Sequence, residues 1–234
     1  MKKFVILFCL ILISCATVPD PTPESSMSLR YLALGDSYTI GESVAEAERF
    51  PNQLAGMLAN EGLTVEVKII ARTGWTTDEL WDGIQKETLS PPYDMVSLLI
   101  GVNNQYRGRD IEEYREGFVF LLNKAIEYAG GDPQRVIVFS IPDWGVTPFA
   151  AGRDASQIAG EIDAFNQVNL EEAQETGAHY VDVTPVSRQA KDDPSLIATD
   201  GLHPSSKMYA EWARSALPIA LDFMNKQPQR HREH

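Results

Sequence analysis

Cysteine is nearly absent from this sequence. Only two cysteines occur among 234 residues, Cys9 and Cys15, and both lie within the first fifteen positions. The rest of the chain therefore has no disulfide, no thiolate metal site and no cysteine nucleophile. No metal and no other cofactor is indicated, so the chemistry of the protein must come from other side chains.

Basic residues are also few. The chain has 20 Lys and Arg against 33 Asp and Glu, which gives a formal net charge of -13 and a pI of about 4.7. An acidic surface without a basic stripe repels phosphate backbones, so nucleic acid is excluded as a partner. With 44% hydrophobic and 23% charged residues, the composition is that of an ordinary globular protein of one domain.

Long hydrophobic runs are missing apart from one at the start. Residues 4–13 are apolar throughout, which is too short to span a bilayer, and they follow Lys2 and Lys3. This pattern is typical of an export signal. The run ends in Leu12-Ile13-Ser14-Cys15, which resembles the lipobox of bacterial lipoproteins, where the cysteine becomes a lipidated N-terminus. We expect residues 1–15 to be a lipoprotein signal with lipidation at Cys15. The alternative is a plain secretory peptide with an incidental cysteine.

Residues 16–28 contain three prolines at alternate positions and no apolar periodicity. They predict an extended tether that reaches up to about 40 Å, at roughly 3 Å per residue. Two acyl chains hold a protein stably on a membrane, so we expect attachment to a bacterial cell envelope. Ala16 carries no acidic signal for retention at the inner membrane, which favours the outer membrane. Residues 227–234 are predicted to be a polar tail.

Apolar segments alternate with segments of helical periodicity across residues 29–226, which we take as the folded domain. The predicted strands are 29–34, 64–70, 95–100, 135–140 and 179–183, and the predicted long helices are 50–61, 77–87, 110–129, 155–176 and 205–224. Strands joined by helical crossovers predict an α/β fold, a three-layer α/β/α sandwich around a mostly parallel five-stranded sheet. Binding sites in such sheets lie at the carboxyl ends of the strands.

Three residues suited to nucleophilic chemistry stand near this predicted edge. Ser37 follows the first strand, and Asp200 and His203 precede the last helix. A serine hydroxyl is a weak nucleophile until a base takes its proton, and a third group must hold that base. Ser37 and Asp200 also have a structural alternative, since both residues suit a turn. His179 is a rival base, but its place in a predicted strand favours a structural histidine.

Four short blocks, in order and at the right spacing, make the chain resemble the SGNH hydrolases, also called GDSL esterases and lipases. The blocks are Gly35-Asp36-Ser37-Tyr38, Gly74 within Arg72-Thr73-Gly74-Trp75, Gly101-Val102-Asn103-Asn104, and Asp200-Gly201-Leu202-His203-Pro204. The resemblance covers about residues 30–220 and implies a flavodoxin-like SGNH fold and ester hydrolysis by a Ser37–His203–Asp200 triad. It also implies an oxyanion hole made of the backbone N–H groups of Ser37 and Gly74 and the side-chain amide of Asn103. Asn104 stands where the family usually has Asp, so a hydrogen bond is retained there without a charge.

The substrate is less constrained by the sequence. The aromatic residues Tyr38, Trp75, Tyr106, Trp144 and Phe149 lie on loops of the predicted edge, where they can contact substrate or simply pack the loops. No insertion is large enough to form a lid or a deep lipid tunnel, which favours small acyl groups, acetyl foremost, on a carbohydrate or other polar alcohol. The alternatives are a lysophospholipase or thioesterase of the same family, and a glycan-binding lipoprotein without catalysis. Arg107 and Arg109 can meet an anionic substrate, although exposed arginines rarely act so specifically. The oligomeric state is left open.

Overall fold

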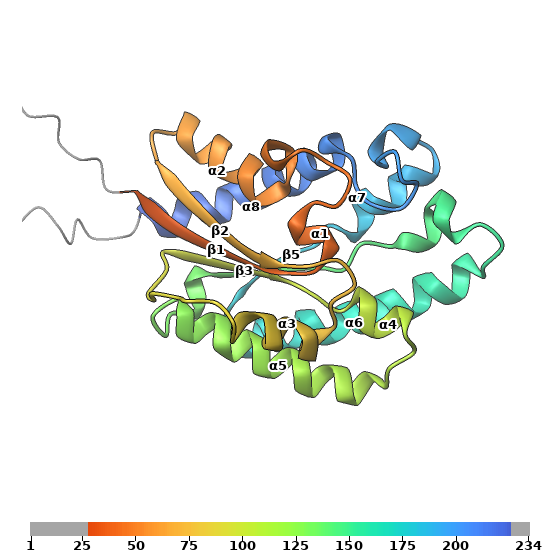
Figure 1. Cartoon of the computed structure of the whole chain (residues 1–234), viewed down its shortest axis with the longest axis horizontal. Helices are drawn as coiled ribbons and strands as arrows, with labels where there is room; N and C mark the ends of the chain where they lie inside the picture. The colour runs from red at the N-terminus through yellow and green to blue at the C-terminus, as the bar shows by residue number, and fades with distance from the viewer. Residues whose placement is uncertain (1–27, 226–234) are drawn as a thin grey trace, which may run out of the picture.

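The structure is a computed structural model that describes residues 28–225 (Figure 1). Its centre is a five-stranded sheet in which every neighbouring pair of strands is parallel, with the order β2-β1-β3-β4-β5. The strands are β1 (Leu29–Gly35), β2 (Val65–Ala71), β3 (Met95–Leu99), β4 (Val136–Phe139) and β5 (His179–Val181). The predicted parallel α/β sandwich is therefore confirmed.

The strand order places a crevice between β1 and β3. After β1 the chain moves to β2 on one side, and it then returns to place β3 on the other side of β1. Helices that leave the two strands in opposite directions cannot fill the space above their carboxyl ends, which is where ligands bind in open α/β sheets. The segments that follow β1 and β3 carry Ser37 and Asn103.

Long helices cover both faces of the sheet. Figure 1 shows α2 (Phe50–Asn60) and α8 (Ser206–Asn225) on one face, and α3 (Thr77–Ile84), α5 (Ile111–Tyr128) and α6 (Ala155–Thr176) on the other. The sequence placed all five, with ends that differ by up to three residues. Asp110 lies just outside α5 as its N-cap and accepts hydrogen bonds from the N–H groups of Glu112 and Glu113.

The short helical segments were not predicted, and all but one of them lie in stretches of chain that follow a strand. They are the helices α1 (Ser37–Ile40), α4 (Val102–Tyr106) and α7 (Thr184–Arg188) and the 3₁₀ turns η1 (Glu46–Glu48), η2 (Pro133–Arg135), η3 (Trp144–Val146), η4 (Pro148–Ala150), η5 (Gln189–Lys191) and η6 (Pro194–Leu196), of which η2 alone precedes a strand. Isolated helices of four or five residues are unstable, so tertiary contacts must hold them.

The core lies on both sides of the central strands. Every residue of β3 and β4 is buried, because both faces of these strands are covered by helices. On the α2 and α8 side the rings of Phe50, Tyr209 and Trp212 pack against one another and toward Phe139. The sheet is thereby a rigid platform for the loops at its carboxyl edge.

The two ends of the described chain lie together at the amino edge of the sheet. Figure 1 shows the start of β1 and the end of α8 at the same end of the molecule, with α1, α4 and α7 at the other. No helix within residues 28–225 is long and apolar enough to cross a membrane. The predicted signal with Cys15, the tether up to residue 27 and the tail at 227–234 lie outside the described residues.

Candidate active site

Ser37 is the first residue of α1, immediately beyond the end of β1. The chain turns sharply at Gly35, where a Cβ atom would overlap the Thr39 side chain and the Leu99 carbonyl oxygen. The N–H of a first helical residue has no carbonyl one turn earlier to bind. Ser37 therefore presents both its hydroxyl and its backbone N–H at the carboxyl edge of the sheet.

Asp36 precedes Ser37 and is completely buried. Its carboxylate caps α1 by accepting from the Tyr38 N–H at 3.0 Å, and it lies 3.4 Å from the amide nitrogen of Asn103. Burial raises the pKa of Asp36 to about 7, and these hydrogen bonds offset only part of that rise. A titratable group without solvent contact thus lies directly behind the serine.

Asp200 and His203 form a hydrogen-bonded pair on the loop before α8. Asp200 Oδ2 lies 2.6 Å from His203 Nδ1, and Asp200 Oδ1 accepts from the N–H groups of Leu202 and His203 at 2.9 and 3.0 Å. Burial acts to raise the pKa of Asp200, but the hydrogen bonds from His203, Leu202 and Ser43 outweigh it and hold that pKa well below its usual range. The ionised carboxylate places a proton on Nδ1, which leaves Nε2 as the basic nitrogen.

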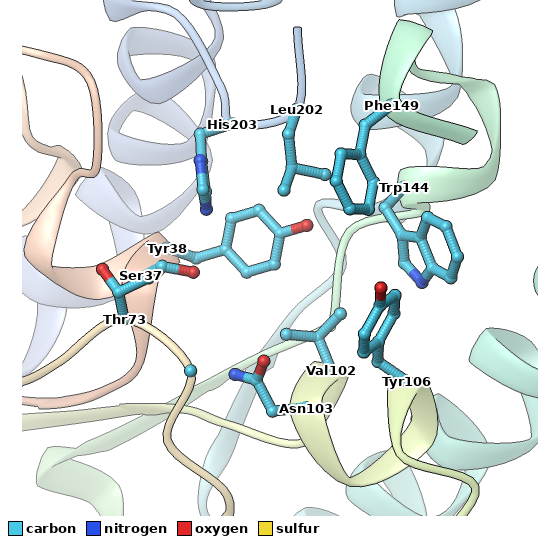
Figure 2. Close-up of a pocket in the computed structure, with 11 residues that line it drawn as sticks. Ser37, Tyr38, Thr73, Val102, Asn103, Tyr106, Trp144, Phe149, Leu202 and His203 are labelled. Carbon is cyan, nitrogen blue, oxygen red and sulfur yellow. The ribbon is translucent and has the colours of Figure 1, made fainter. Parts of the chain in front are cut away.

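The loop that carries this pair is fixed by backbone hydrogen bonds. Ala198 N–H donates to the carbonyl of His203 at 2.8 Å, Ile197 and Pro204 form an antiparallel bridge, and Ser205 N–H donates to Leu196. These bonds hold the backbone on both sides of His203 in place. Figure 2 shows its imidazole directed toward Ser37.

Ser43 is a contact that the sequence analysis missed. Its hydroxyl donates to Asp200 Oδ2 at 2.7 Å across 157 positions of sequence. Its backbone has φ 65, the left-handed conformation that residues other than glycine rarely adopt. Such local strain persists where the surrounding structure requires it, and here it places a donor on the carboxylate that holds His203.

Asn103 and Gly74 bring the other two predicted oxyanion donors to the same edge. Asn103 is in α4, and its amide nitrogen donates to the carbonyl of Trp75 at 2.9 Å. Gly74 has φ 88 and stands between the end of β2 and α3, with only Arg107 Nη2 within 4 Å of where a Cβ would be. The open side of this glycine leaves room for a ligand to approach the backbone.

Asn104 is buried and points away from the pocket. Its Oδ1 accepts from the Thr77 N–H at 3.1 Å, and its Nδ2 donates to the Thr77 hydroxyl at 3.0 Å. The amide therefore fixes the start of α3 with both of its polar atoms and leaves no buried charge. The exchange of the usual Asp for Asn is accommodated by this pair of bonds.

A pocket of about 170 Å³ opens between these groups, with the arrangement seen in Figure 2. Its walls are Ser37, Tyr38, Thr73, Gly74, Val102, Asn103, Tyr106, Trp144, Phe149, Leu202 and His203. The polar groups stand on one side, and aromatic and aliphatic side chains form the other. Serine, base and donors thus converge on a space that is large enough for a small acyl group and its neighbouring atoms.

The aromatic wall is itself braced. Tyr106 and Trp144 meet edge to face at 5.4 Å between ring centres, and Phe149 lies 6.3 and 6.0 Å from them. Trp144 is fixed by a hydrogen bond from its indole N–H to Gln105, whereas Tyr106 and Phe149 are each 45% exposed. Arg153 lies over all three rings and donates to the Tyr106 hydroxyl.

Most of the residues predicted to contact substrate line the pocket, but Trp75 and the two arginines do not. Tyr38, Tyr106, Trp144 and Phe149 line it, as do Thr73, Val102 and Leu202, which the sequence analysis did not name as pocket residues. Trp75 was predicted to contact substrate, but its ring packs instead against Gly83 of α3. A Cβ atom at Gly83 would overlap this ring. Because Gly83 has no side chain, the indole of Trp75 fits against α3 and does not line the pocket.

The two arginines that follow α4, Arg107 and Arg109, are already paired. Arg107 binds the carbonyl of Gly74 and an oxygen of Glu79, and Arg109 pairs with Asp78 and Glu113. His179 begins β5 and therefore lies toward the amino edge, away from the pocket. Within residues 28–225, no cluster of His, Cys, Asp and Glu is arranged to hold a metal ion.

This arrangement can activate a hydroxyl and bind negative charge on an adjacent oxygen. Residues 33–211 match the model of the GDSL-like Lipase/Acylhydrolase family. The chain belongs to this family. The protein is accordingly an ester hydrolase, which removes the alternative of a glycan-binding lipoprotein without catalysis.

Solved structures of other proteins have the same fold. TesA is 17% identical with a TM-score of 0.63, and the match covers 83% of this chain and 99% of that one. The acetylxylan esterase Axe2 from Geobacillus stearothermophilus is 20% identical with a TM-score of 0.64, covering 83% and 96%. A lipase/acylhydrolase from Enterococcus faecalis is 22% identical with a TM-score of 0.63, covering 84% and 96%. At these identities the likeness is one of fold. No curated protein matches the chain.

Proposed function

We propose that this GDSL hydrolase cleaves carboxylic esters through an acyl-enzyme on Ser37. His203 Nε2 takes the hydroxyl proton as Ser37 Oγ attacks the ester carbonyl, and the protonated imidazole then gives that proton to the leaving alcohol. Water repeats the sequence on the acyl-enzyme and releases the acid. Asp200 holds the imidazole and stabilises its charged form.

Negative charge forms on the carbonyl oxygen in each tetrahedral intermediate. The donors assigned to it are the N–H groups of Ser37 and Gly74 and the side-chain amide of Asn103. The observation that carries the proposal is the convergence of these donors, Ser37 and the Asp200-bound His203 on one pocket. No hydrogen bond joins Ser37 and His203 among the described residues, which is common before substrate tightens a catalytic site.

The test is hydrolysis of short p-nitrophenyl esters in the presence of a chelator. Ser37→Ala and His203→Gln are each expected to lose on the order of 10⁴-fold or more in kcat, whereas His179→Gln keeps its activity. Labelling by a fluorophosphonate should occur in the wild type and disappear in Ser37→Ala. Full activity of Ser37→Ala would refute the acyl-enzyme.

We further propose that the substrates carry small acyl groups, acetyl foremost, on carbohydrate or another polar alcohol. The pocket is small, and the exposed rings of Tyr106 and Phe149 at its rim offer flat apolar surfaces of the kind that stack on sugars. Axe2, which has the same fold, is an acetylxylan esterase.

A second candidate function is the hydrolysis of esters with a longer acyl chain, as by a lysophospholipase or thioesterase. The apolar wall formed by Val102, Trp144 and Leu202 favours it. Profiling kcat/KM on p-nitrophenyl esters from two to sixteen carbons, with acetylated xylan and lysophospholipid in parallel, separates the two. A rate that rises steadily beyond about eight carbons would overturn the short-acyl proposal, because each buried methylene contributes about 0.8 kcal/mol only where an apolar tunnel receives it.

For its location we propose a lipid-anchored protein of the bacterial cell envelope, on the outer membrane, with Cys15 as the lipidated first residue. The lysines, apolar run and lipobox-like end of residues 1–15 support this. Small-molecule or glycan esters are the proposed partners in that compartment.

A further inference from the structure

Gly74 must be held in one conformation if its N–H is to serve as an oxyanion donor. A glycine at φ 88 has no side chain to restrict it, so neighbouring groups have to fix its two peptide planes. The turn is closed by the Trp75 N–H, which donates to the carbonyl of Arg72 at 3.2 Å. On one side of Gly74, the Thr73 hydroxyl donates to Glu42, and on the other the Gly74 carbonyl accepts from Arg107 Nη2 at 2.6 Å.

Arg107 is held in place for this contact. Its Nη1 lies 3.2 Å from an oxygen of Glu79, and the Glu79 side chain also accepts from the backbone N–H of Thr76, the N-cap of α3. The guanidinium thus bridges the carbonyl of the turn and the first turn of a helix. This uses the fixed fork of arginine, which a lysine ammonium does not possess.

The chain segment of Arg107 also carries Asn103, another of the proposed oxyanion donors. Asn103 lies in α4, and the Arg107 N–H donates to the Asn103 carbonyl at 3.1 Å at the end of that helix. Asn103 binds the carbonyl of Trp75, and Arg107 binds that of Gly74. Two successive carbonyls of the turn are therefore fixed by two side chains of one α4 segment.

We infer that Arg107 is a positioning residue for the oxyanion hole, whose guanidinium fixes the Gly74 turn so that the Gly74 N–H is directed at the developing oxyanion. This role rests on the proposed function and deepens it. It also assigns the guanidinium to the enzyme rather than to an anionic substrate. A donor displaced by a fraction of an ångström stabilises the transition state less while leaving substrate binding nearly unchanged.

The test compares Arg107→Met and Arg107→Lys with Arg109→Met in the full protein. Arg109 is the matched control, since it lies two residues away and forms ion pairs with Asp78 and Glu113 without touching the turn. With uncharged p-nitrophenyl acetate, both Arg107 variants are expected to lose roughly 10- to 100-fold in kcat, with KM within about 2-fold, because one oxyanion donor is misplaced. Arg109→Met is expected to match the wild type.

Two further measurements separate this role from others. Binding of a trifluoromethyl ketone that mimics the tetrahedral intermediate should weaken by the same factor as kcat, since the analogue uses the oxyanion donors. Melting temperatures should stay within about 2 °C of the wild type, because exposed ion pairs contribute little to stability.

The outcomes are distinguishable. Wild-type kcat in Arg107→Met, a loss confined to KM, or a loss seen only with a negatively charged ester would overturn the inference. A normal rate in Arg107→Lys alone would also overturn it, since charge and not the fork would then suffice. Failure of the proposed function itself would be seen in a different variant, as full activity of Ser37→Ala.

Discussion

Asp36 gives a stability effect whose sign follows from its burial. The carboxyl is 0% exposed, and burial raises its pKa from 3.8 to about 7. The folded protein keeps the proton of Asp36 over a range of pH in which the unfolded chain has released it. The stabilising contribution of this proton is therefore complete below about pH 4 and is lost as the pH rises through about 7. At about 1.4 kcal/mol per pH unit, the loss amounts to at most about 4 kcal/mol.

The perturbation is Asp36→Asn, which keeps an oxygen for the Tyr38 N–H and cannot titrate. Urea unfolding of both proteins at pH 4, 5, 6, 7 and 8 gives the free energy of unfolding of each. We expect the variant to gain about 2 to 4 kcal/mol relative to the wild type between pH 4 and pH 8. Groups common to both proteins cancel in this difference, and a constant offset from altered contacts does not depend on pH.

The result that would refute this reasoning is a pair of parallel stability curves. A variant that loses stability relative to the wild type as the pH rises would also refute it, because folding would then lower the pKa of Asp36. Equal slopes of the unfolding free energy against urea concentration in the two proteins are the control for an unchanged unfolding reaction.

Three more predictions follow from other groups. Log kcat/KM should fall on the acid side with a slope of one proton, because His203 must be neutral to act as the base while Asp200, whose pKa is held low, stays ionised. The same slope in Asp36→Asn would assign this proton to the histidine, and a flat profile down to about pH 4.5 would show that His203 is not the base. Cys15→Ala should release the protein from membranes or leave it unprocessed, and a fully processed, membrane-bound variant would contradict lipidation. Tyr114→Phe should cost about 1 to 3 kcal/mol in thermal or urea unfolding, because it leaves a buried amide oxygen on α6 without its donor; an unchanged stability would contradict that bond.

The sheet and the long helices could be predicted because their signals are local. The apolar run of β3 and the caps at Asp110 and Gly177 mark their elements within a few residues. The short helix α4 could not be predicted in this way. Its contacts include the bond from Asn103 to Trp75, which joins segments that meet only after the sheet has formed. Local sequence patterns were therefore enough to predict the sheet and the long helices. They were not enough at the carboxyl edge, where the crossovers bring together segments that are distant in the sequence.

The candidate site divides in the same way. The blocks that contain Ser37 and His203 place them at one sheet edge once a parallel sheet is assumed, and the structure brings both to one pocket. Ser43 had no comparable signal, because its partner Asp200 is 157 positions away and its left-handed backbone is unusual for serine. The prediction for Trp75 failed for a physical reason. Successive side chains of a turn point in different directions, so Thr73 and Gly74 line the pocket while the indole of Trp75 packs on Gly83.

The position of the two ends of the domain sets the direction in which the proposed enzyme would face. β1 begins at Leu29 and ends next to Ser37, and its seven residues at about 3.3 Å each separate the two by about 20 Å along the strand. If the chain is anchored through Cys15, it is held by the edge opposite its pocket, which then opens away from the supporting bilayer. Polymers and small esters that approach from the aqueous side meet the pocket directly. A lipid in that same bilayer is reached only when the whole domain turns over on its tether.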